Sequence, residues 1–484
     1  MSFCSFQFLI FFPIVFILYF TIPKKYQWVL LLVSSYYFYM CWKPEFIVLI
    51  IISTCIDYFA ARNIEKSESW KKKMWLLVSI CSNLSILFFF KYFNFFGDNV
   101  NSFFRMLSIP FTVPSLNIIL PVGISFYTFQ TMSYTIEVYR GNMEAEKHLG
   151  YFALFVTFFP QLVAGPIEKA QNLLPQLRKE HEFSYDDAVY GTKLMVWGFF
   201  KKMVVADTMA IYVDKVYNNL SSVSNGLTLV MATFFFAMQV YCDFGGYSDI
   251  ARGCAKIMGV DLMVNFKSPY FFSKSIKEYW GRNHISLSNW FTAYVYIPLG
   301  GSRKGLFRKY LNNMITFLLS GLWHGADWTF IIWGGLQSIY LNVGDFLRRK
   351  LNREHIVELK NHRVQNLFSI IVTCCLSCFS LIFFRANNIH DAMYVVHNLF
   401  NGIGKPLQYF RDGLATFKLT DVFSMALPLV ILYIFDYINE KCDAIQQSAI
   451  LPKNMQRLVY IAFIVYLTLA IPNTVTNAFI YFQF

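Results

Sequence analysis

Apolar segments recur along the whole chain, and charged residues gather between them. Four such segments follow one another near the start, at roughly Phe6 to Phe20, Trp28 to Met40, Phe46 to Ala60 and Met74 to Phe90. Hydrophobic residues make up 56% of the 484 residues and charged residues only 15%, whereas a soluble domain carries about 25% charged residues. Because a helix in lipid satisfies its own backbone and exposes apolar side chains, we expect an all-α polytopic membrane protein.

Further apolar segments continue this pattern to the end of the chain. Several are shorter than the about 20 residues that a perpendicular span needs, so some are expected to be re-entrant or interfacial helices. We predict about 11 transmembrane helices plus such shorter helices, in one membrane domain of residues 1–484. The segments are Ile118 to Tyr134, Tyr151 to Val163, Ala188 to Val205, Leu227 to Tyr241, Tyr310 to Trp323, Trp328 to Val343, Leu367 to Phe384, Val422 to Ile438 and Leu458 to Ile471.

The basic residues indicate the orientation of these segments. Lys24 and Lys25 follow the first segment, and a basic run from Arg62 to Lys73 follows the third, whereas the connection around Lys43 is nearly neutral. Short loops rich in Lys and Arg stay in the cytoplasm, so the N-terminus is predicted to be extracytoplasmic. The net charge of +13 is explained by these loops, and no nucleic acid partner is expected.

Common catalytic and metal-binding patterns are missing. The sequence contains no G-x-S-x-G, H-E-x-x-H, P-loop or G-x-G-x-x-G, which argues against hydrolase, metalloprotease, ATPase and nucleotide-dehydrogenase chemistry. Cys375 and Cys378 form a C-x-x-C inside an apolar run with no second pair nearby, so we expect them to pack rather than bind metal. No metal site is predicted.

Two of the eight histidines occupy unusual positions. Ionisable groups at membrane depth are costly, so each is a candidate for function. His324 lies in an apolar stretch between Gly321 and Gly325, and small residues allow another backbone or a substrate to come close. His284 lies in a basic and aromatic stretch, which suits either an interfacial helix at anionic headgroups or the wall of a site for an anionic acyl donor.

Carboxylates also fall inside an apolar region. The segment Y-C-D-F-G-G-Y-S-D, Tyr241 to Asp249, directly follows an apolar span. Its polar groups could satisfy the backbone of a broken helix. We favour the alternative in which Asp243 and Asp249 orient a catalytic histidine or brace an arginine.

Several motifs together resemble the membrane-bound O-acyltransferase family, and the resemblance covers nearly the whole chain in order. Within that family the chain is most similar to the bacterial branch that acetylates alginate and peptidoglycan, and the Y-I-P-L-G-G segment favours this branch over teichoic acid D-alanylation. The motifs are P-V-G-I-S-F-Y-T-F-Q from Pro121, Q-L-V-A-G-P-I from Gln161, Y-C-D-F-G-G-Y-S-D, N-H-I-S-L-S-N-W from Asn283, Y-I-P-L-G-G from Tyr296 and G-L-W-H-G from Gly321.

The resemblance implies a fold and an activity. Family members form a helical ring around a central funnel, with the acyl donor entering from the cytoplasm and the acceptor from outside. The essential histidine of the family corresponds to His324 and its second histidine to His284. We therefore expect an O-acetyltransferase of a bacterial inner membrane that uses acetyl-CoA as donor and a periplasmic or secreted SGNH-type acetyltransferase as partner, and that modifies alginate, peptidoglycan or another exopolysaccharide.

The sequence suggests supporting residues for such a reaction. His324 is assigned as the general base, because an imidazole with a pKa near 6.5 stays neutral at physiological pH. Asn283, Ser320 and backbone amides are candidates to stabilise the oxyanion. Where the family has a basic pair and a tryptophan before its second histidine, this chain has Gly281, Arg282 and Asn283. A basic cluster is expected to attract the donor's phosphates, and it comprises Lys274, Lys277, Arg282, Arg303 and Lys304.

The C-terminus resembles a known acyl carrier. The chain ends F-I-Y-F-Q-F, and the partner peptide of teichoic acid D-alanylation ends F-x-Y-x-x-F with a tyrosine that can carry the acyl group. The similarity suggests Tyr481 as an acyl relay, and an interfacial aromatic end is the alternative. Other functions stay open at this point: a lipid-directed acyltransferase, a transporter or flippase, for which no internal symmetry is found, and a non-catalytic scaffold.

Overall fold

The chain is built from helices. A computed structural model describes residues 1–163, 165–267, 270–353, 362–414, 419–443, 445, 452–470 and 479, and no strand occurs among them. The chain divides into two compact units, Met1–Met195 with Ile250–Met263, and Val196–Asp249 with Val264–Phe484.

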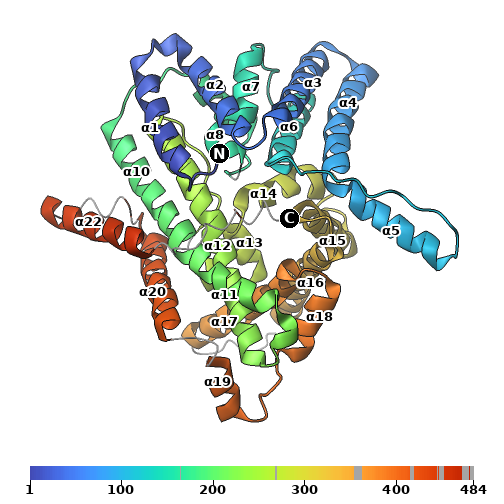
Figure 1. Cartoon of the computed structure of the whole chain (residues 1–484). Coiled ribbons are helices and arrows are strands. Elements are labelled where there is room, and N and C mark those ends of the chain that lie inside the picture. The colour runs from blue at the N-terminus through green and yellow to red at the C-terminus, as the bar shows by residue number, and fades with distance from the viewer. Residues whose placement is uncertain are drawn as a thin grey trace. The chain divides into compact units, whose positions relative to one another are not determined.

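The first unit is a group of mostly antiparallel helices connected by short segments (Figure 1). The helix α10 (Tyr185–Phe199) and the long helix α12 (Gly226–Ile257) contribute residues to both units. The other helices of this unit are α1 (Phe6–Thr21), α2 (Gln27–Met40), α3 (Ile47–Lys66), α4 (Ser69–Leu87), α5 (Phe93–Met106), α6 (Ile124–Tyr139), α7 (Leu149–Thr157), α8 (Phe159–Leu162) and α9 (Ala170–Arg178).

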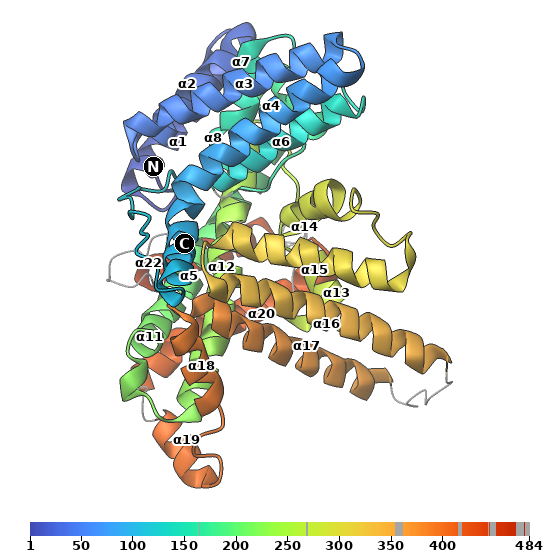
Figure 2. The same ribbon diagram turned by 90° about the vertical axis from the view of Figure 1, so that its right-hand side faces the viewer.

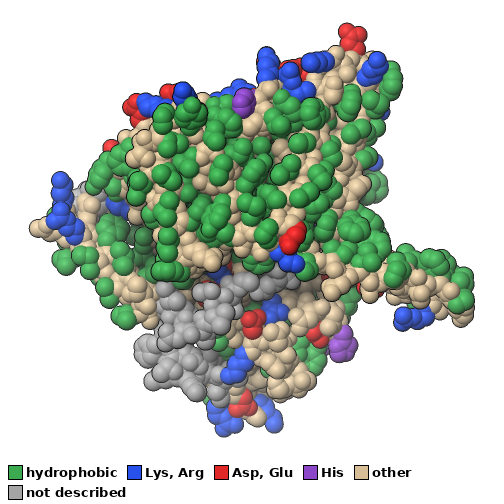
Figure 3. Space-filling view, turned by 45° about the horizontal axis from the view of Figure 1, so that its top comes forward, with side chains coloured by type: hydrophobic (Ala, Val, Ile, Leu, Met, Phe, Trp, Pro, Cys, Tyr) green, Lys and Arg blue, Asp and Glu red, His purple; other side chains and the backbone are tan. Residues whose placement is uncertain are grey.

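Apolar side chains cover the outside of this unit as well as its interior. Helix α3 packs against α4, and both pack against α6. Figure 3 shows hydrophobic side chains spread over a broad face, with charged residues gathered along its edge. Leu9 and Ile14 of α1, Ile51 of α3 and Leu77 of α4 are among the exposed apolar residues. Such a surface is stable in lipid, where apolar side chains need no burial.

The second unit contains the longer helices of the C-terminal half. Helices α15, α16 and α17 lie side by side in Figure 2, with α16 packed against both neighbours. The helices are α11 (Asp207–Tyr217), α13 (Ile276–Arg282), α14 (Ile285–Phe291), α15 (Gly305–His324), α16 (Trp328–Arg353), α17 (His362–Arg385), α18 (Ile389–Asn398), α19 (Pro406–Leu414), α20 (Leu419–Lys441) and α22 (Lys453–Ala470).

Helical stretches that are long and apolar enough to cross a membrane occur in both units. Among the described residues there are four, Pro44–Lys66, Ser69–Met106, Gly226–Ile257 and Arg363–Arg385, and α1 is a shorter apolar helix. Each of the four contains one of the predicted apolar segments. The prediction of an all-helical chain with apolar spans is therefore confirmed at this level.

Two predicted segments differ from the structure. The segment Ile118 to Tyr134 becomes helical only at Ile124, because Pro121 and Gly123, with φ of 74°, form the turn that precedes α6. The segment Tyr151 to Val163 is divided between α7 and α8, with the break at Phe158. An apolar run alone does not reveal such a break.

Candidate active site

Glycines fix the end of α15, where His324 is the last residue. A Cβ atom on Gly321 would lie 2.3 Å from the carbonyl oxygen of Phe330, and one on Gly334 would lie 2.2 Å from that of Phe317. Neither position has room for a side chain, so the backbones of α15 and α16 come into direct contact. This contact holds His324 in one place relative to α16.

Aromatic rings enclose His324. Its side chain is buried, with 4% of the residue exposed. The imidazole centroid lies 5.0 Å from Trp333 of α16 and 5.4 Å from Phe384 of α17. A proton transfer at this imidazole would take place away from bulk water.

His284 lies at the start of α14 in a strained backbone conformation. Its φ of 46° and ψ of 53° are in the left-handed region, which is uncommon for a residue other than glycine. Burial lowers the pKa of this imidazole to about 3, so the ring is neutral at physiological pH. Strain of this kind often marks a functional position.

Asn265 sets the tautomer of His284. The Asn265 side-chain oxygen accepts from the backbone N–H of Ser286 at 3.1 Å, which fixes the orientation of the amide. The same oxygen lies 3.3 Å from Nδ1 of His284, so Nδ1 donates the hydrogen bond. The lone pair of this neutral ring is therefore on Nε2.

The two histidines lie in one aromatic cluster. Their ring centroids are 6.3 Å apart, and both rings also contact Trp323. Phe244 of α12 packs on His284 with a centroid distance of 4.5 Å. The structure thus brings together the two histidines that the sequence singled out from regions 40 residues apart in the chain.

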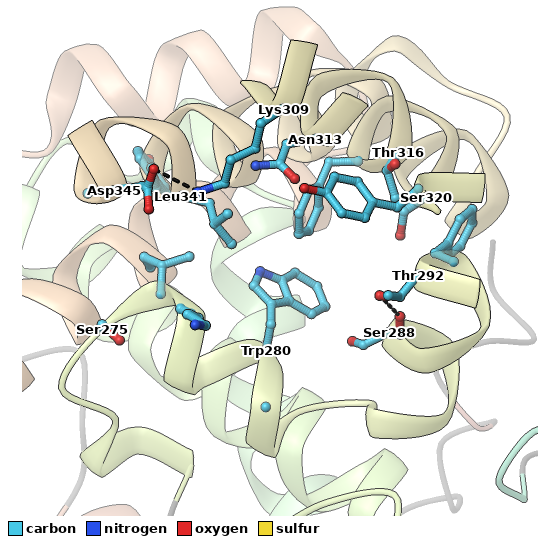
Figure 4. A pocket seen from close by; sticks show the side chains of 18 of the residues that line it. Ser275, Trp280, Ser288, Thr292, Lys309, Asn313, Thr316, Ser320, Leu341 and Asp345 are labelled. Carbon is cyan, nitrogen blue, oxygen red and sulfur yellow. Dashed lines mark hydrogen bonds and ion pairs between the residues drawn. The ribbon is translucent and has the colours of Figure 1, made fainter. Parts of the chain in front are cut away.

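A cavity of about 590 Å³ opens in the same unit (Figure 4). Figure 4 shows Trp280 between the Lys309–Asp345 ion pair on one side and the hydroxyl groups of Thr316 and Ser320 on the other. Ser320 is one helical turn before His324 on α15. The cavity therefore has a charged part and a neutral polar part, and Ser320 of the neutral part lies one turn from His324 on α15.

Asp345 is held ionised by its neighbours. The Nζ atom of Lys309 lies 2.7 Å from the carboxylate, and Nε of Arg349 lies 2.9 Å from it. Although partial burial acts in the opposite direction, these two cations hold the pKa of Asp345 below its ordinary value. Arg348 and Lys277 also line the cavity, so its charged part carries more positive than negative groups.

The basic residues predicted for the donor have different surroundings. Lys277 lines the cavity, whereas the described lining does not include Lys274, Arg303 or Lys304, which are exposed. Arg282 donates to both carboxylate oxygens of Glu440 at 2.7 Å and also binds Glu278. Its guanidinium therefore joins α13 to α20.

The two residues predicted for the oxyanion also differ. Ser320 is buried and lines the cavity. Asn283 donates from its side chain to the hydroxyl group of Tyr279 at 3.0 Å, an interaction that stabilises the end of α13. Of the two, Ser320 is the residue that the cavity includes.

The carboxylates of α12 form ion pairs with lysines. Asp249 lies 2.8 Å from Nζ of Lys201, and Asp243 lies 3.0 Å from Nζ of Lys202. Lys202 also binds Asp207 at 2.8 Å. These lysine pairs are contacts that we did not predict, and the expected roles of Asp243 and Asp249 toward a histidine or an arginine stay predictions.

Sequence reasoning missed the lysines and Asn265. Lys201 and Lys202 interrupt the apolar segment Ala188 to Val205, and the cost of such charges at membrane depth is the signal that should have singled them out. Asn265 has no comparable signal, since an asparagine between apolar residues is common in loops.

The C-terminal segment contacts the histidine cluster at one described residue. Phe479 is buried, and its ring lies 4.4 Å from Tyr247 and 5.7 Å from Phe244. Phe244 in turn packs on His284. Tyr481 lies outside the described residues.

Comparison with known proteins identifies the family. The sequence profile described as MBOAT, membrane-bound O-acyltransferase family, matches residues 146–385. The chain is 38% identical over 395 residues to the protein named probable alginate O-acetylase AlgI of Pseudomonas putida, which covers 81% of this chain and 78% of that protein. It is 32% identical over 402 residues to the peptidoglycan O-acetyltransferase of Helicobacter pylori, covering 77% and 74%. With the teichoic acid D-alanyltransferase of Bacillus subtilis it shares 28% identity over 294 residues, covering 57% and 71%.

Two buried histidines and a partly charged cavity in one helical unit are features that a membrane-embedded enzyme could use. The similarity is more specific, because it extends over most of the chain and of its relatives. The chain belongs to the membrane-bound O-acyltransferase family and is an O-acyltransferase, as its motifs predicted.

Proposed function

We propose that this enzyme transfers acetyl groups from acetyl-CoA in the cytoplasm to hydroxyl groups of a polysaccharide outside the inner membrane. The relatives named alginate O-acetylase and peptidoglycan O-acetyltransferase support these two polymers as acceptors. The observation that carries the proposal is the pair of buried imidazoles, His284 and His324, with ring centroids 6.3 Å apart.

His324 acts as the general base in this proposal. Its imidazole accepts the proton of the acceptor hydroxyl while the oxygen attacks the thioester carbonyl carbon. The tetrahedral intermediate collapses with cleavage of the C–S bond, and the thiolate takes the proton back from the imidazolium to give CoA and the acetyl ester. Such general base catalysis contributes about 100- to 10,000-fold to the rate.

The neutral His284 has a second role beside this base. The ring next to His324 is therefore neutral. A neighbouring cation would make His324 a weaker base, and the neutral ring avoids this. Ser320, which is buried in the cavity wall, is the side chain that we propose to donate to the oxyanion.

The cavity beside α15 is proposed as the site of the donor. Lys277, Lys309 and Arg348 give its charged part an attraction for the phosphates of acetyl-CoA, and the hydroxyl groups of Thr316 and Ser320 suit the amides of the pantetheine arm. A lipid-directed acyltransferase needs an apolar tunnel for its donor. The charged and hydroxyl groups among the lining residues therefore favour a short acyl group on a hydrophilic carrier.

The path of the acetyl group outward involves the C-terminus and a partner protein. We propose that Tyr481 accepts the acetyl group as a phenolic ester and that an SGNH-type partner then transfers it to sugar hydroxyls. The contact of Phe479 with Tyr247 and Phe244 supports this route, since Phe479 precedes Tyr481 by two residues. The proposal also includes an extracytoplasmic N-terminus and about 11 spans in a ring around a funnel, with residues 1–484 acting as one domain.

Acetyl transfer from radiolabelled acetyl-CoA in proteoliposomes tests the proposal. Native protein, His324→Ala, Tyr481→Phe and the exposed control Lys66→Ala are compared, each checked for folding by its elution as a single species. We expect label on the native chain and on the Lys66→Ala control, and none on the other two variants.

The other outcomes separate the parts of the proposal. Label lost only in His324→Ala keeps the acyltransferase and removes the tyrosine relay. Equal label in all variants, or none on folded native protein supplied with its partner, contradicts the mechanism and favours a transporter or a scaffold.

A further inference from the structure

We propose that Trp280 determines which acyl group the enzyme accepts: its indole lines the donor cavity and packs on Trp333, which packs on His324, and it leaves space for an acetyl group but not for longer chains. This inference rests on the proposed function, since it assigns the cavity to the acyl donor. It concerns a residue that has no part in the chemical step itself.

Trp280 lines the cavity and is connected to His324 through Trp333. It lines the cavity from α13, and its ring centroid is 5.9 Å from that of Trp333. Trp333 is on α16, and its ring is 5.0 Å from that of His324. The described lining of the cavity includes Trp280 but neither Trp333 nor His324. An acyl group that moves from this cavity toward the base along this row of rings passes the face of Trp280.

Hydrogen bonds hold Trp280 in this position. Its Nε1 atom donates to Oε1 of Gln337 at 3.2 Å. The amide of Gln337, which is buried, donates in turn to Oγ of Ser380 at 2.7 Å. These residues belong to α13, α16 and α17, so three helices fix the orientation of the indole. Phe317 packs against the same ring, with centroids 5.2 Å apart.

A rigid aromatic wall of this kind selects acyl groups by the length of their carbon chain. The carbonyl carbon of every acyl donor must occupy the same position for attack, so any carbons beyond the acetyl methyl are directed into the surrounding rings. Trp333 and Phe384 pack directly on His324 and occupy space beside it. Each methylene that an apolar pocket must accommodate or reject changes the specificity by about 10- to 200-fold. Shortening the indole opens volume on the cavity side of this wall.

The test measures kcat/KM with acetyl-, propionyl-, butyryl- and hexanoyl-CoA in proteoliposomes for native protein, Trp280→Leu and Phe291→Leu. Phe291 lines the same cavity from α14 and serves as the matched control. We expect the ratio of kcat/KM for butyryl-CoA to that for acetyl-CoA to rise by about tenfold or more over the native value in Trp280→Leu, which is the change expected when a pocket gains room for a methylene. In the control the ratio should stay within about twofold of the native value.

Two further variants keep the test decisive. Trp280→Phe removes less volume and covers the case in which the leucine variant does not fold; we expect it to raise propionyl transfer more than butyryl transfer. Gln337→Met keeps the indole but removes its hydrogen bond, and we expect a smaller increase in the same ratio.

The failures of the two proposals are distinguishable. If native protein transfers no acetyl group, the proposed function fails. If native protein is active and the folded Trp280 variants lose activity equally for all four donors, or keep the native ratio, the role of Trp280 in specificity is overturned while the acyltransferase remains.

Discussion

The two units bury carboxylates inside apolar helices in different ways. In the first unit Asp57 of α3 accepts from neutral donors of α4, the hydroxyl of Ser79 at 2.5 Å and the amide of Asn83 at 2.8 and 2.9 Å. In the second unit Asp207 and Asp243 share the ammonium group of Lys202. One region satisfies its acid by hydrogen bonds and the other by opposite charge.

The two kinds of buried carboxylate contact differ in how close they lie to the histidines. The hydroxyl of Thr131 on α6 donates to Asn83, so the Asp57 cluster joins three helices that carry none of the predicted site residues. Lys202 belongs to the π-helical segment Phe200–Ala206, and its partner Asp243 directly precedes Phe244, which packs on His284. π-helical turns inside helices are frequent at functional sites. Ion pairs thus occur where α12 must be held firmly behind the histidine.

Lys202→Met should give the largest effect. The variant leaves Asp207 and Asp243 without the cation that they share, and removal of one partner from a buried pair costs about 3–5 kcal/mol. We expect a large loss of stability in unfolding experiments in mixed micelles, together with loss of acetyl transfer.

A combined variant sharpens this prediction. Lys202→Met with Asp207→Asn and Asp243→Asn removes the stranded charges and should recover most of the stability. Lys304→Met, at an exposed lysine, is the control for loss of a positive charge. Equal stability of Lys202→Met and the control would show that the ion pairs contribute nothing.

Asp57→Ala should have a smaller effect. It leaves the donors Ser79 and Asn83 without their acceptor, which costs about 1–3 kcal/mol for uncharged groups. Asp57→Asn retains an acceptor oxygen and should cost less than the alanine variant. Both are measured by unfolding in the same micelles, and a loss as large as that of Lys202→Met would remove the distinction between the two regions.

The buried imidazole of His284 makes the free energy of unfolding depend on pH. The pKa of His284 is about 3 in the folded protein, below the ordinary value of 6.5, so the unfolded chain binds the proton first as the pH falls. The stability is complete above pH 6.5 and falls by about 1.4 kcal/mol per unit between pH 6.5 and 3. His284→Gln should lack this component, and unfolding of both proteins at pH 7.5 and 5.5 measures it. Parallel pH profiles would contradict the burial of a neutral imidazole.

The helices were predictable from sequence, and their interruptions were not. Long apolar runs such as Leu367 to Phe384 indicate a helix because lipid imposes one. The break at Phe158 depends on local backbone geometry, which the composition of the run does not encode.

Site residues were predictable from sequence only where a single ionisable residue lies among apolar neighbours, because burying such a residue is energetically costly. His284 and His324 are conspicuous among apolar neighbours, and the structure brings their rings together. The lysine partners of Asp243 and Asp249 depend on which helices pack against α12, and the sequence of the segment Tyr241 to Asp249 does not contain that information. Charge in the sequence likewise did not distinguish Lys277, which lines the cavity, from Arg303, which the described lining does not include.

Among the variants compared, loss of an exposed ion pair should have the smallest effect on stability. Lys24 binds Glu182 in the first unit, and both side chains are open to solvent, which screens their attraction. Side-chain ordering opposes what attraction is left. We therefore expect Lys24→Met to leave the melting temperature unchanged at moderate salt, although it removes an ion pair just as Lys202→Met does. If Lys24→Met were as damaging as Lys202→Met, burial would not be the cause of the difference between pairs, and the ordering of all these variants would have to be attributed to net charge instead.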